Sequence, residues 1–401
     1  MRRVLLVVAG VVAVLVAHGT VGAAQAASAA IDVTTLTPEA ANVYRTWQRY
    51  LVSKGGKWSE NAGLPSADWV DSEQRRRWPL YDLAGFYLAD GATPTIVGID
   101  HVTSCGDTAY RITTRFELGD QRLGAPSWFT TVTETVYAVT DGGRWVLGNA
   151  LLRNTCGWRR VTVGAMTYVF APDYPYNAAR AHRAAAFVDS LASAFQVPKL
   201  DSLTYYLAPN VDEMYRIIGV ESAVRSAPNA VGGLAQPINH QLFSGSPVIG
   251  EEYRHELAHL VLAPLCCART SYLVSEGVPT WIGGTAGMDF STAARGLAAF
   301  LAEHPLVSLD SMLSGQFPNA QFYPAGAVLT AMVFDRGGVA AVRGLFDAGR
   351  TPAELRPALA QLFGQSWSSI VVEWRRRVMA FAPSPPDGAD ADNGVRGREH
   401  L

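Results

Sequence analysis

Charge is the first property that this sequence has little of. Only 17% of its 401 residues are Asp, Glu, Lys or Arg, and the formal net charge is −2. Proteins that bind nucleic acid or an anionic membrane surface usually carry a basic excess, so neither partner is expected. Hydrophobic residues make up 49% of the chain, which indicates a folded protein with a core. At this length two domains are expected.

The N-terminus lacks a hydrophobic run long enough to span a membrane. Its apolar stretch, Val4 to Ala17, is fourteen residues long and follows two arginines, Arg2 and Arg3. Ala24-Gln25-Ala26 then fits the A-x-A pattern of signal-peptide cleavage. The sequence therefore predicts a signal peptide over residues 1–26 and a secreted or extracytoplasmic protein. The alternative is an uncleaved signal that anchors the chain.

Cysteine is scarce, with four residues in the chain. In an exported protein these favour disulfides. Cys105 and Cys156 both lie in the strand-rich first half, and we expect them to pair. Cys266 and Cys267 are adjacent, and neighbouring cysteines rarely bridge each other. Their state is left open between strained, free and bonded elsewhere.

The chain has no G-x-S-x-G motif, so serine hydrolysis has no support. Its histidines are few, eight in all, yet two of them stand in the motif H-E-x-x-H as His255, Glu256 and His259. Residues four apart lie on the same face of a helix, so both imidazoles can bind one metal ion. Zinc suits imidazole and usually has three protein ligands in a catalytic site. The alternative is a helix that carries two histidines by chance.

A third ligand is available seventeen residues beyond His259, at Glu276. Pro264 should end the first helix, and the following loop can turn the chain back. We expect a second helix that starts near Ser275, because Pro279 is tolerated best in a first helical turn. The alternative role for Glu276 is an ordinary charge at a helix N-terminus.

The H-E-L-A-H motif with a Glu-Gly pair some seventeen residues on resembles the gluzincin metallopeptidases. The resemblance covers roughly residues 160–380, with a slightly short spacing to the glutamate. It implies that His255, His259 and Glu276 bind Zn²⁺ and that Glu256 is the general base. It also implies a tyrosine or histidine near the developing oxyanion, for which Tyr323 is the candidate, with packing as its alternative role.

The first domain is expected over residues 36–157. Thr37 and Pro38 predict the start of a helix that ends at Gly55. Alternating sequence then predicts antiparallel strands at 95–99, 109–116, 131–139 and 144–147. A helix followed by such a meander resembles the cone-shaped fold of nuclear transport factor 2. Asp100 and His101 are the one tempting pair here, and a surface location is the better interpretation.

The second domain is expected over residues 160–380, with 381–401 as a disordered tail. Strands are predicted at 166–170, at 203–207 and within 232–240, with helices at 177–195 and 211–218 between them. In the gluzincin resemblance the last of these is an edge strand that lines the cleft and pairs with a peptide, and Pro237 suits an edge. His240 could reach that cleft or lie on the surface. Four further helices are predicted at 291–302, 308–313, 352–363 and 366–378, and another begins near 322 and ends near 337. The fold class is therefore α+β: a cone-like helix-and-sheet domain followed by a zincin-like domain.

The function predicted from these residues is that of an exported zinc metallopeptidase acting on a peptide or protein substrate. Two alternatives stay open. The first is a binding protein that retains a zincin domain as a scaffold. The second is a structural zinc site, which usually needs four ligands and cysteine, here only Cys266 and Cys267. No G-x-M-E-N-like strand occurs, so a site that anchors a free amino terminus is not supported.

Overall fold

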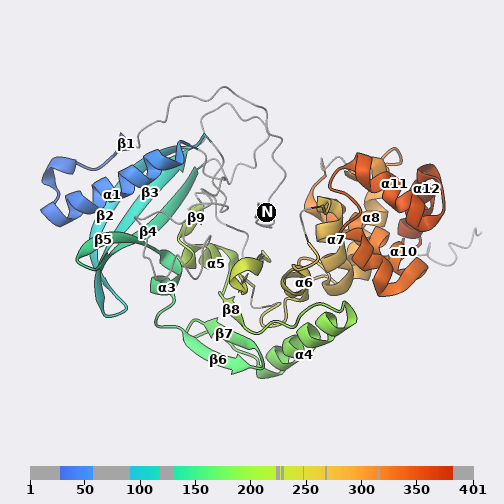
Figure 1. Cartoon of the computed structure of the whole chain (residues 1–401), viewed down its shortest axis with the longest axis horizontal. Helices are drawn as coiled ribbons and strands as arrows, with labels where there is room; N and C mark the ends of the chain where they lie inside the picture. The colour runs from blue at the N-terminus through green and yellow to red at the C-terminus, as the bar shows by residue number, and fades with distance from the viewer. Residues whose placement is uncertain are drawn as a thin grey trace, which may run out of the picture.

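The computed structural model describes residues 28–56, 91–117, 131–222, 226, 230–246, 248–266, 269–313 and 317–382. The predicted signal peptide lies outside the described residues, as does the predicted tail beyond residue 382. Within them the fold is α+β, as the sequence predicts: an antiparallel sheet comes first, followed by a mixed sheet and a group of helices (Figure 1).

The first sheet is a meander covered by one long helix. Strands β2 to β5 pair in sequence order and antiparallel, and the short β1 lies parallel to β2. The elements are β1 (Ser28–Ala29), η1 (Val33–Thr35), α1 (Pro38–Lys54), β2 (Thr93–Ser104), β3 (Asp107–Glu117), β4 (Thr131–Asp141), β5 (Arg144–Asn149) and α3 (Ala150–Asn154). All four predicted strands and the predicted helix are therefore confirmed.

Helix α1 begins and ends where its sequence predicts. The Thr37 side chain accepts the N–H of Ala40, Pro38 occupies the first turn, and Gly55 closes the helix at φ 58°. Trp47 is fully buried against the sheet, and its indole N–H donates to the Thr114 hydroxyl at 2.7 Å. A tryptophan with a satisfied N–H fixes the helix on the sheet.

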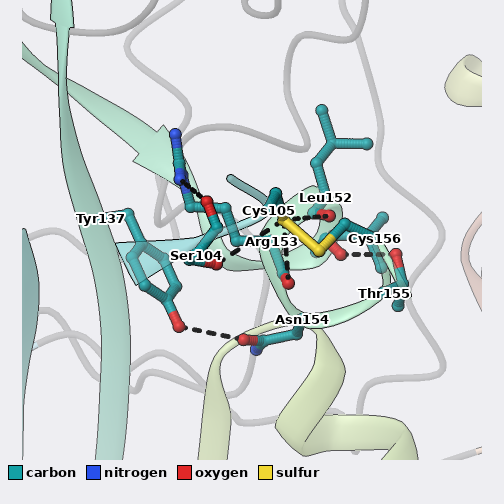
Figure 2. Close-up of a disulfide and its surroundings, with 9 residues drawn as sticks. Ser104, Cys105, Tyr137, Leu152, Arg153, Asn154, Thr155 and Cys156 are labelled. Atoms are coloured by element: carbon teal, nitrogen blue, oxygen red, sulfur yellow. Dashed lines mark hydrogen bonds between the residues drawn. A yellow bond between two sulfur atoms is a disulfide. The ribbon is translucent and has the colours of Figure 1, made fainter. Parts of the chain in front are cut away.

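A disulfide joins Cys105 to Cys156, as predicted, with an S–S distance of 2.22 Å (Figure 2). It links the turn between β2 and β3 to the end of α3, across 51 residues. Arg153 next to it donates to the Ser104 carbonyl at 3.0 Å. Cys266 is also disulfide-bonded, and its partner is not among the described residues.

The second sheet carries the order β10-β11-β8-β7-β6. Its elements are β6 (Arg159–Val163), β7 (Met166–Phe170), α4 (Ala178–Ala194), β8 (Leu203–Leu207), α5 (Val211–Ile217), β10 (Gly233–Gln236), η3 (Pro237–Asn239) and β11 (Gln241–Ser244). The predicted strands and helices are confirmed, and β10 is the edge strand. The segment 159–163, which none of the predicted strands covers, is also a strand and forms a hairpin with β7.

One core cluster crosses the boundary predicted between the two domains. Strand β9 (Val220–Ser222), which lies in the second half of the sequence, pairs antiparallel with β4 of the first sheet. Tyr206, Leu234 and Phe243 from the second sheet pack in the same cluster as Trp47 of α1. One face of the second sheet therefore packs in a cluster shared with α5, α1 and the first sheet, and its other face packs against α4 and α6.

The remaining helices gather on the side opposite the first sheet (Figure 1). They are α6 (Arg254–Leu262), α7 (Tyr272–Gly283), α8 (Phe290–Glu303), α9 (Leu309–Leu313), α10 (Asn319–Leu345), α11 (Pro352–Phe363) and α12 (Trp367–Met379). Helix α10 breaks at Gly337 and Gly338, where its predicted end lies. It is long and apolar enough to span a membrane, and it is the one such helix among the described residues. Half of its apolar window is buried inside the protein.

Candidate metal centre

Helix α6 carries the H-E-x-x-H motif, as predicted, and the second sheet fixes where this helix begins. No side chain caps it. Instead the Tyr205 hydroxyl accepts the N–H of Tyr253 at 3.2 Å and donates to the Gly250 carbonyl at 2.7 Å. Tyr168 from the next strand donates to the carbonyl of Glu251. Two buried tyrosines of the sheet therefore hold the turn from which the helix with the H-E-x-x-H motif starts.

The two histidines and the distant glutamate come together. The Nε2 atoms of His255 and His259 lie 3.1 Å apart. The Oε2 atom of Glu276, from α7, lies 3.4 Å from His255 Nε2 and 3.5 Å from His259 Nε2. The ligand atoms all lie within 4.8 Å of one another, and Glu276 is only 2% exposed. We refer to these three residues as the metal cluster.

The predicted start of the second helix is wrong. Helix α7 begins at Tyr272, with the Ser271 side chain accepting the N–H of Val274, and Glu276 lies in its second turn. Pro279 therefore sits in the helix interior. Without an N–H, Pro279 leaves the Ser275 carbonyl without its usual helical partner. Burial against α6 and α10 compensates for that loss, which a sequence rule based on proline alone cannot register.

A backbone carbonyl sets the tautomer of His255. Its Nδ1 lies 2.9 Å from the carbonyl oxygen of Gly284, which can only accept a hydrogen bond. Nδ1 therefore carries the hydrogen, and the lone pair of Nε2 faces the other two members of the cluster. This is the arrangement that a metal-binding histidine needs.

The electrostatics of the cluster fit a cation. Burial alone would raise the pKa of Glu276, but the positive charge of His259 beside it holds the pKa well below its usual value. Burial likewise opposes a charge on His259, yet the Glu276 carboxylate raises its pKa. Glu276 Oε1 is buried and has no hydrogen-bond partner among the described residues. Two imidazoles and one carboxylate form a donor set that zinc takes in catalytic sites, so the residues fit this metal.

Glu256 lies beside the edge strand, one residue along the helix from His255. A Cβ atom added at Gly233 of β10 would come within 2.6 Å of Glu256 Cγ and 2.4 Å of the Tyr253 ring. Strand and helix can approach this closely only because residue 233 has no side chain. Glu256 is partly exposed, whereas His255 is buried. The Glu256 side chain thus packs against β10, one residue along α6 from His255 of the metal cluster.

Tyr323, which belongs to α10, lies next to the metal cluster. Its ring stacks on the His255 imidazole, with centroids 5.6 Å apart and planes at 9°. Its hydroxyl lies 3.3 Å from the hydroxyl of Tyr272. Burial, together with the charge of Glu276, raises the pKa of Tyr323 well above its ordinary value, so the phenol keeps its hydrogen.

Sequence reasoning missed four residues that shape this site: Gly233, Tyr253, Tyr272 and Gly284. Only Tyr272 left a usable signal. It stands four residues before Glu276 and would have been placed on the same helical face had Ser271 been read as the N-cap.

The other sequence candidates lie outside the metal cluster. His240 closes the turn between β10 and β11 at φ 48° and is not one of the three clustered ligands. Asp100 forms an ion pair with Arg111 at 2.8 Å, with both side chains about half exposed. His101 packs edge-on against Tyr110. The surface interpretation of Asp100 and His101 is confirmed.

Comparison with known proteins gives a distant likeness. No family model matches the chain, and no curated protein sequence matches it. Among solved structures it is similar to the M1 zinc metallopeptidase from Deinococcus radiodurans, at 15% identity and a TM-score of 0.33, over 73% of this chain and 65% of that one. A mutant of that enzyme bound to a Tyr-Ser-Ala substrate aligns at 14% identity and a TM-score of 0.31, over 74% and 65%.

A second likeness is to an aminopeptidase N family protein from Idiomarina loihiensis, at 12% identity and a TM-score of 0.31, over 54% of this chain and 46% of that one. The chain thus spans less than two thirds of the length of these proteins. The case for a metal centre rests on the residues described above.

Proposed function

We propose that this protein is an exported, zinc-dependent peptidase of the gluzincin type. The observation that carries the proposal is the convergence of His255, His259 and Glu276, with Glu256 and Tyr323 beside them. Bound zinc would supply a Lewis acid and lower the pKa of a water molecule at the site.

Side chains of the protein provide the proton transfer and the stabilisation of the developing negative charge. Glu256, partly exposed and next to the cluster, accepts the proton of the attacking water and returns it to the leaving amine. The Tyr323 hydroxyl donates a hydrogen bond to the substrate carbonyl oxygen as negative charge develops there. His255 is held in the required tautomer by the Gly284 carbonyl.

A peptide is the substrate that this arrangement suits. Among the described residues strand β10 pairs with β11 alone, so its other edge offers backbone hydrogen-bonding groups next to Glu256. Its residues, Gly233 to Gln236, include no acid that would bind a free amino terminus. The Deinococcus radiodurans enzyme, whose mutant was solved with a Tyr-Ser-Ala substrate, supports a peptide as the class of ligand.

The Cys105–Cys156 disulfide supports the predicted export. Disulfides persist in oxidising compartments and are rare in the cytosol. Export would deliver the peptidase to a compartment where this bond can form.

Metal content and peptide cleavage together test the proposal. Purified protein should contain about one zinc ion per chain and cleave members of a peptide library, and Glu276→Ala should lose most of the metal. Chelation should abolish cleavage, and added zinc should restore it. Full zinc occupancy without cleavage would favour the scaffold alternative. A wild-type protein that takes up no supplied zinc would overturn the metal assignment itself.

A further inference from the structure

Two phenol side chains, those of Tyr272 and Tyr323, meet beside the metal cluster. The proposed function gives a role only to Tyr323. The Tyr272 and Tyr323 hydroxyls lie 3.3 Å apart. Their rings meet edge to face, with centroids 6.4 Å apart and planes at 70°. The contact joins α7, which carries Glu276, to α10.

Tyr272 is held rigidly in this contact. It is the first residue of α7, directly after the capping Ser271, and it stands one helical turn before Glu276 on the same face. Its ring stacks on Phe322, with centroids 5.0 Å apart and planes at 20°. A phenol has few rotatable bonds, so packing on both sides leaves its hydroxyl little freedom.

Hydrogen counting leaves this contact two possible directions. Each phenol has one hydrogen to donate and lone pairs to accept with, so a single hydrogen lies between the two oxygens. A phenol loses its hydrogen only near pH ~10, so each tyrosine keeps its hydrogen at neutral pH. If Tyr272 donates, the hydrogen of Tyr323 stays available for a substrate oxygen. A donated hydrogen bond also polarises the accepting hydroxyl and strengthens the bond that it donates in turn.

We propose that Tyr272 is a positioning residue that donates its hydroxyl hydrogen to Tyr323 and thereby aims the Tyr323 hydroxyl at the carbonyl oxygen of the substrate. This inference rests on the proposed function. It assigns to Tyr272 an effect on the transition state and none on metal binding, because His255, His259 and Glu276 supply the proposed ligand atoms.

A double-mutant cycle on the zinc-loaded full chain tests this assignment. Tyr272→Phe keeps the ring that packs on Phe322 and removes only the hydroxyl. It should lower kcat by roughly 3- to 10-fold with KM within about twofold, as expected for a lost hydrogen bond that acts in the transition state. In the Tyr323→Phe background the same change should have an effect below about 1.5-fold, because the two hydroxyls act as one unit.

A binding measurement provides a readout that does not require turnover. A peptide phosphonamidate presents an anionic tetrahedral oxygen like that of the transition state. Tyr272→Phe should weaken its affinity, measured by calorimetry, by the same roughly 3- to 10-fold, with zinc content unchanged. Tyr110→Phe is the matched control, because it removes a phenol hydroxyl that also lies near another hydroxyl, Thr37 Oγ1 at 3.4 Å, in the first sheet.

The outcomes separate this inference from the function on which it rests. If the wild type cleaves peptides and Tyr272→Phe has the same kcat, the inference alone is overturned. The same holds if the fold-reduction in kcat of the double variant equals the product of the two single reductions, because the two hydroxyls would then act independently. A drop in zinc content in Tyr272→Phe would also overturn it, since the residue would then act on the metal cluster. A zinc-loaded wild type that neither cleaves peptides nor binds the phosphonamidate would overturn the proposed function and this inference with it.

Discussion

At the scale of single residues, Glu256 and Glu276 show how position divides one side-chain type between two roles. Glu276 is buried within 3.4 to 3.5 Å of both imidazoles, and the positive charge of His259 holds its pKa low. Glu256 is partly exposed beside Gly233 and is not among the clustered ligands. The first geometry suits a ligand, and the second suits a group that must exchange protons with water.

Replacing Glu256 should therefore separate metal binding from catalysis. Glu256→Gln keeps the size of the side chain but removes the proton acceptor, so turnover should fall by about 10²- to 10⁴-fold while zinc content stays the same. The measurement is kcat/KM alongside elemental analysis. Glu303→Gln, at an exposed position at the end of α8, is the control and should leave both values unchanged. Near-normal turnover in Glu256→Gln would refute its role as the base.

The motif residues could be predicted from the sequence because their chemistry is local. Because His255 and His259 are four positions apart on a helix, they lie on the same face whatever the rest of the fold is. The carbonyl of Gly284 and the hydroxyl of Tyr272 are different. Gly284 lies 29 residues from His255, and a carbonyl has no residue-type signature, so only the fold identifies it.

At the scale of elements, the site depends on how closely α7 and α10 approach each other. They cross where Gly277 meets Gly326: a Cβ on Gly277 would come within 2.5 Å of the Gly326 backbone, and one on Gly326 within 2.3 Å of the Leu273 carbonyl oxygen. Gly277 directly follows Glu276. The close crossing therefore fixes the position of Glu276 relative to the two histidines of the metal cluster.

Gly326→Ala should force the two helices apart. Overpacking of this kind typically destabilises a protein by about 1 to 3 kcal/mol. Because α7 must shift, zinc affinity should fall as well. Gly296→Ala in α8 is the control, since a Cβ there meets nothing within 4 Å, and it should be neutral or stabilising by roughly 0.5 to 1 kcal/mol. Thermal unfolding and zinc titration measure the two effects, and an unchanged Gly326→Ala would show that the crossing can relax.

The N-terminus of α11 offers a pH test of a helix cap. Thr351 and Glu354 form a capping box, and hydrogen bonds from the backbone N–H groups of Thr351 and Arg350 lower the pKa of Glu354. A lowered folded-state pKa stabilises the folded protein above the unfolded value, 4.5, and this stabilisation is lost as pH falls through the folded-state pKa.

Glu354→Gln should therefore lower Tm at pH 7, and the difference from wild type should shrink as pH falls below about 4.5. Melting curves across this range measure the effect. A difference in Tm that does not change with pH would mean that the charge of Glu354 contributes nothing to the cap.

Elements with strong local signals could be predicted, and elements that depend on distant partners could not. Strand β7 and helix α11 have the predicted bounds because a run of β-branched and aromatic residues marks the strand and a capping box marks the helix. Strand β11 was missed: all four of its residues, Gln241 to Ser244, are buried, so no alternation marks it. The predicted start of α7 is wrong because Pro279 favours a start near Ser275, whereas the Ser271 cap starts the helix at Tyr272.

At the scale of the whole molecule, the first sheet supports the strand that borders the metal site. Leu234 of β10 and Phe243 of β11 pack in the same cluster as Trp47 and Phe116 of the first unit. Gly233, which precedes Leu234, is the residue against which Glu256 lies. The predicted boundary at 157–160 thus runs through a shared hydrophobic core, which no count of local patterns reveals.

A chain that begins at residue 160 should not fold by itself. It would remove α1 and the first sheet from the cluster that buries Val169, Tyr206, Leu234 and Phe243, which are at most 2% exposed in the full structure, and would leave β9 without its partner β4. Burying each such side chain contributes about 1.5 to 3 kcal/mol, so losing several removes most of the 5 to 15 kcal/mol that usually stabilises a domain. We expect this fragment to aggregate or to show no cooperative thermal transition, whereas the chain from residue 28 onward unfolds cooperatively. A soluble fragment that melts in one transition and binds zinc as tightly as the full chain would instead establish 160–380 as an independent domain.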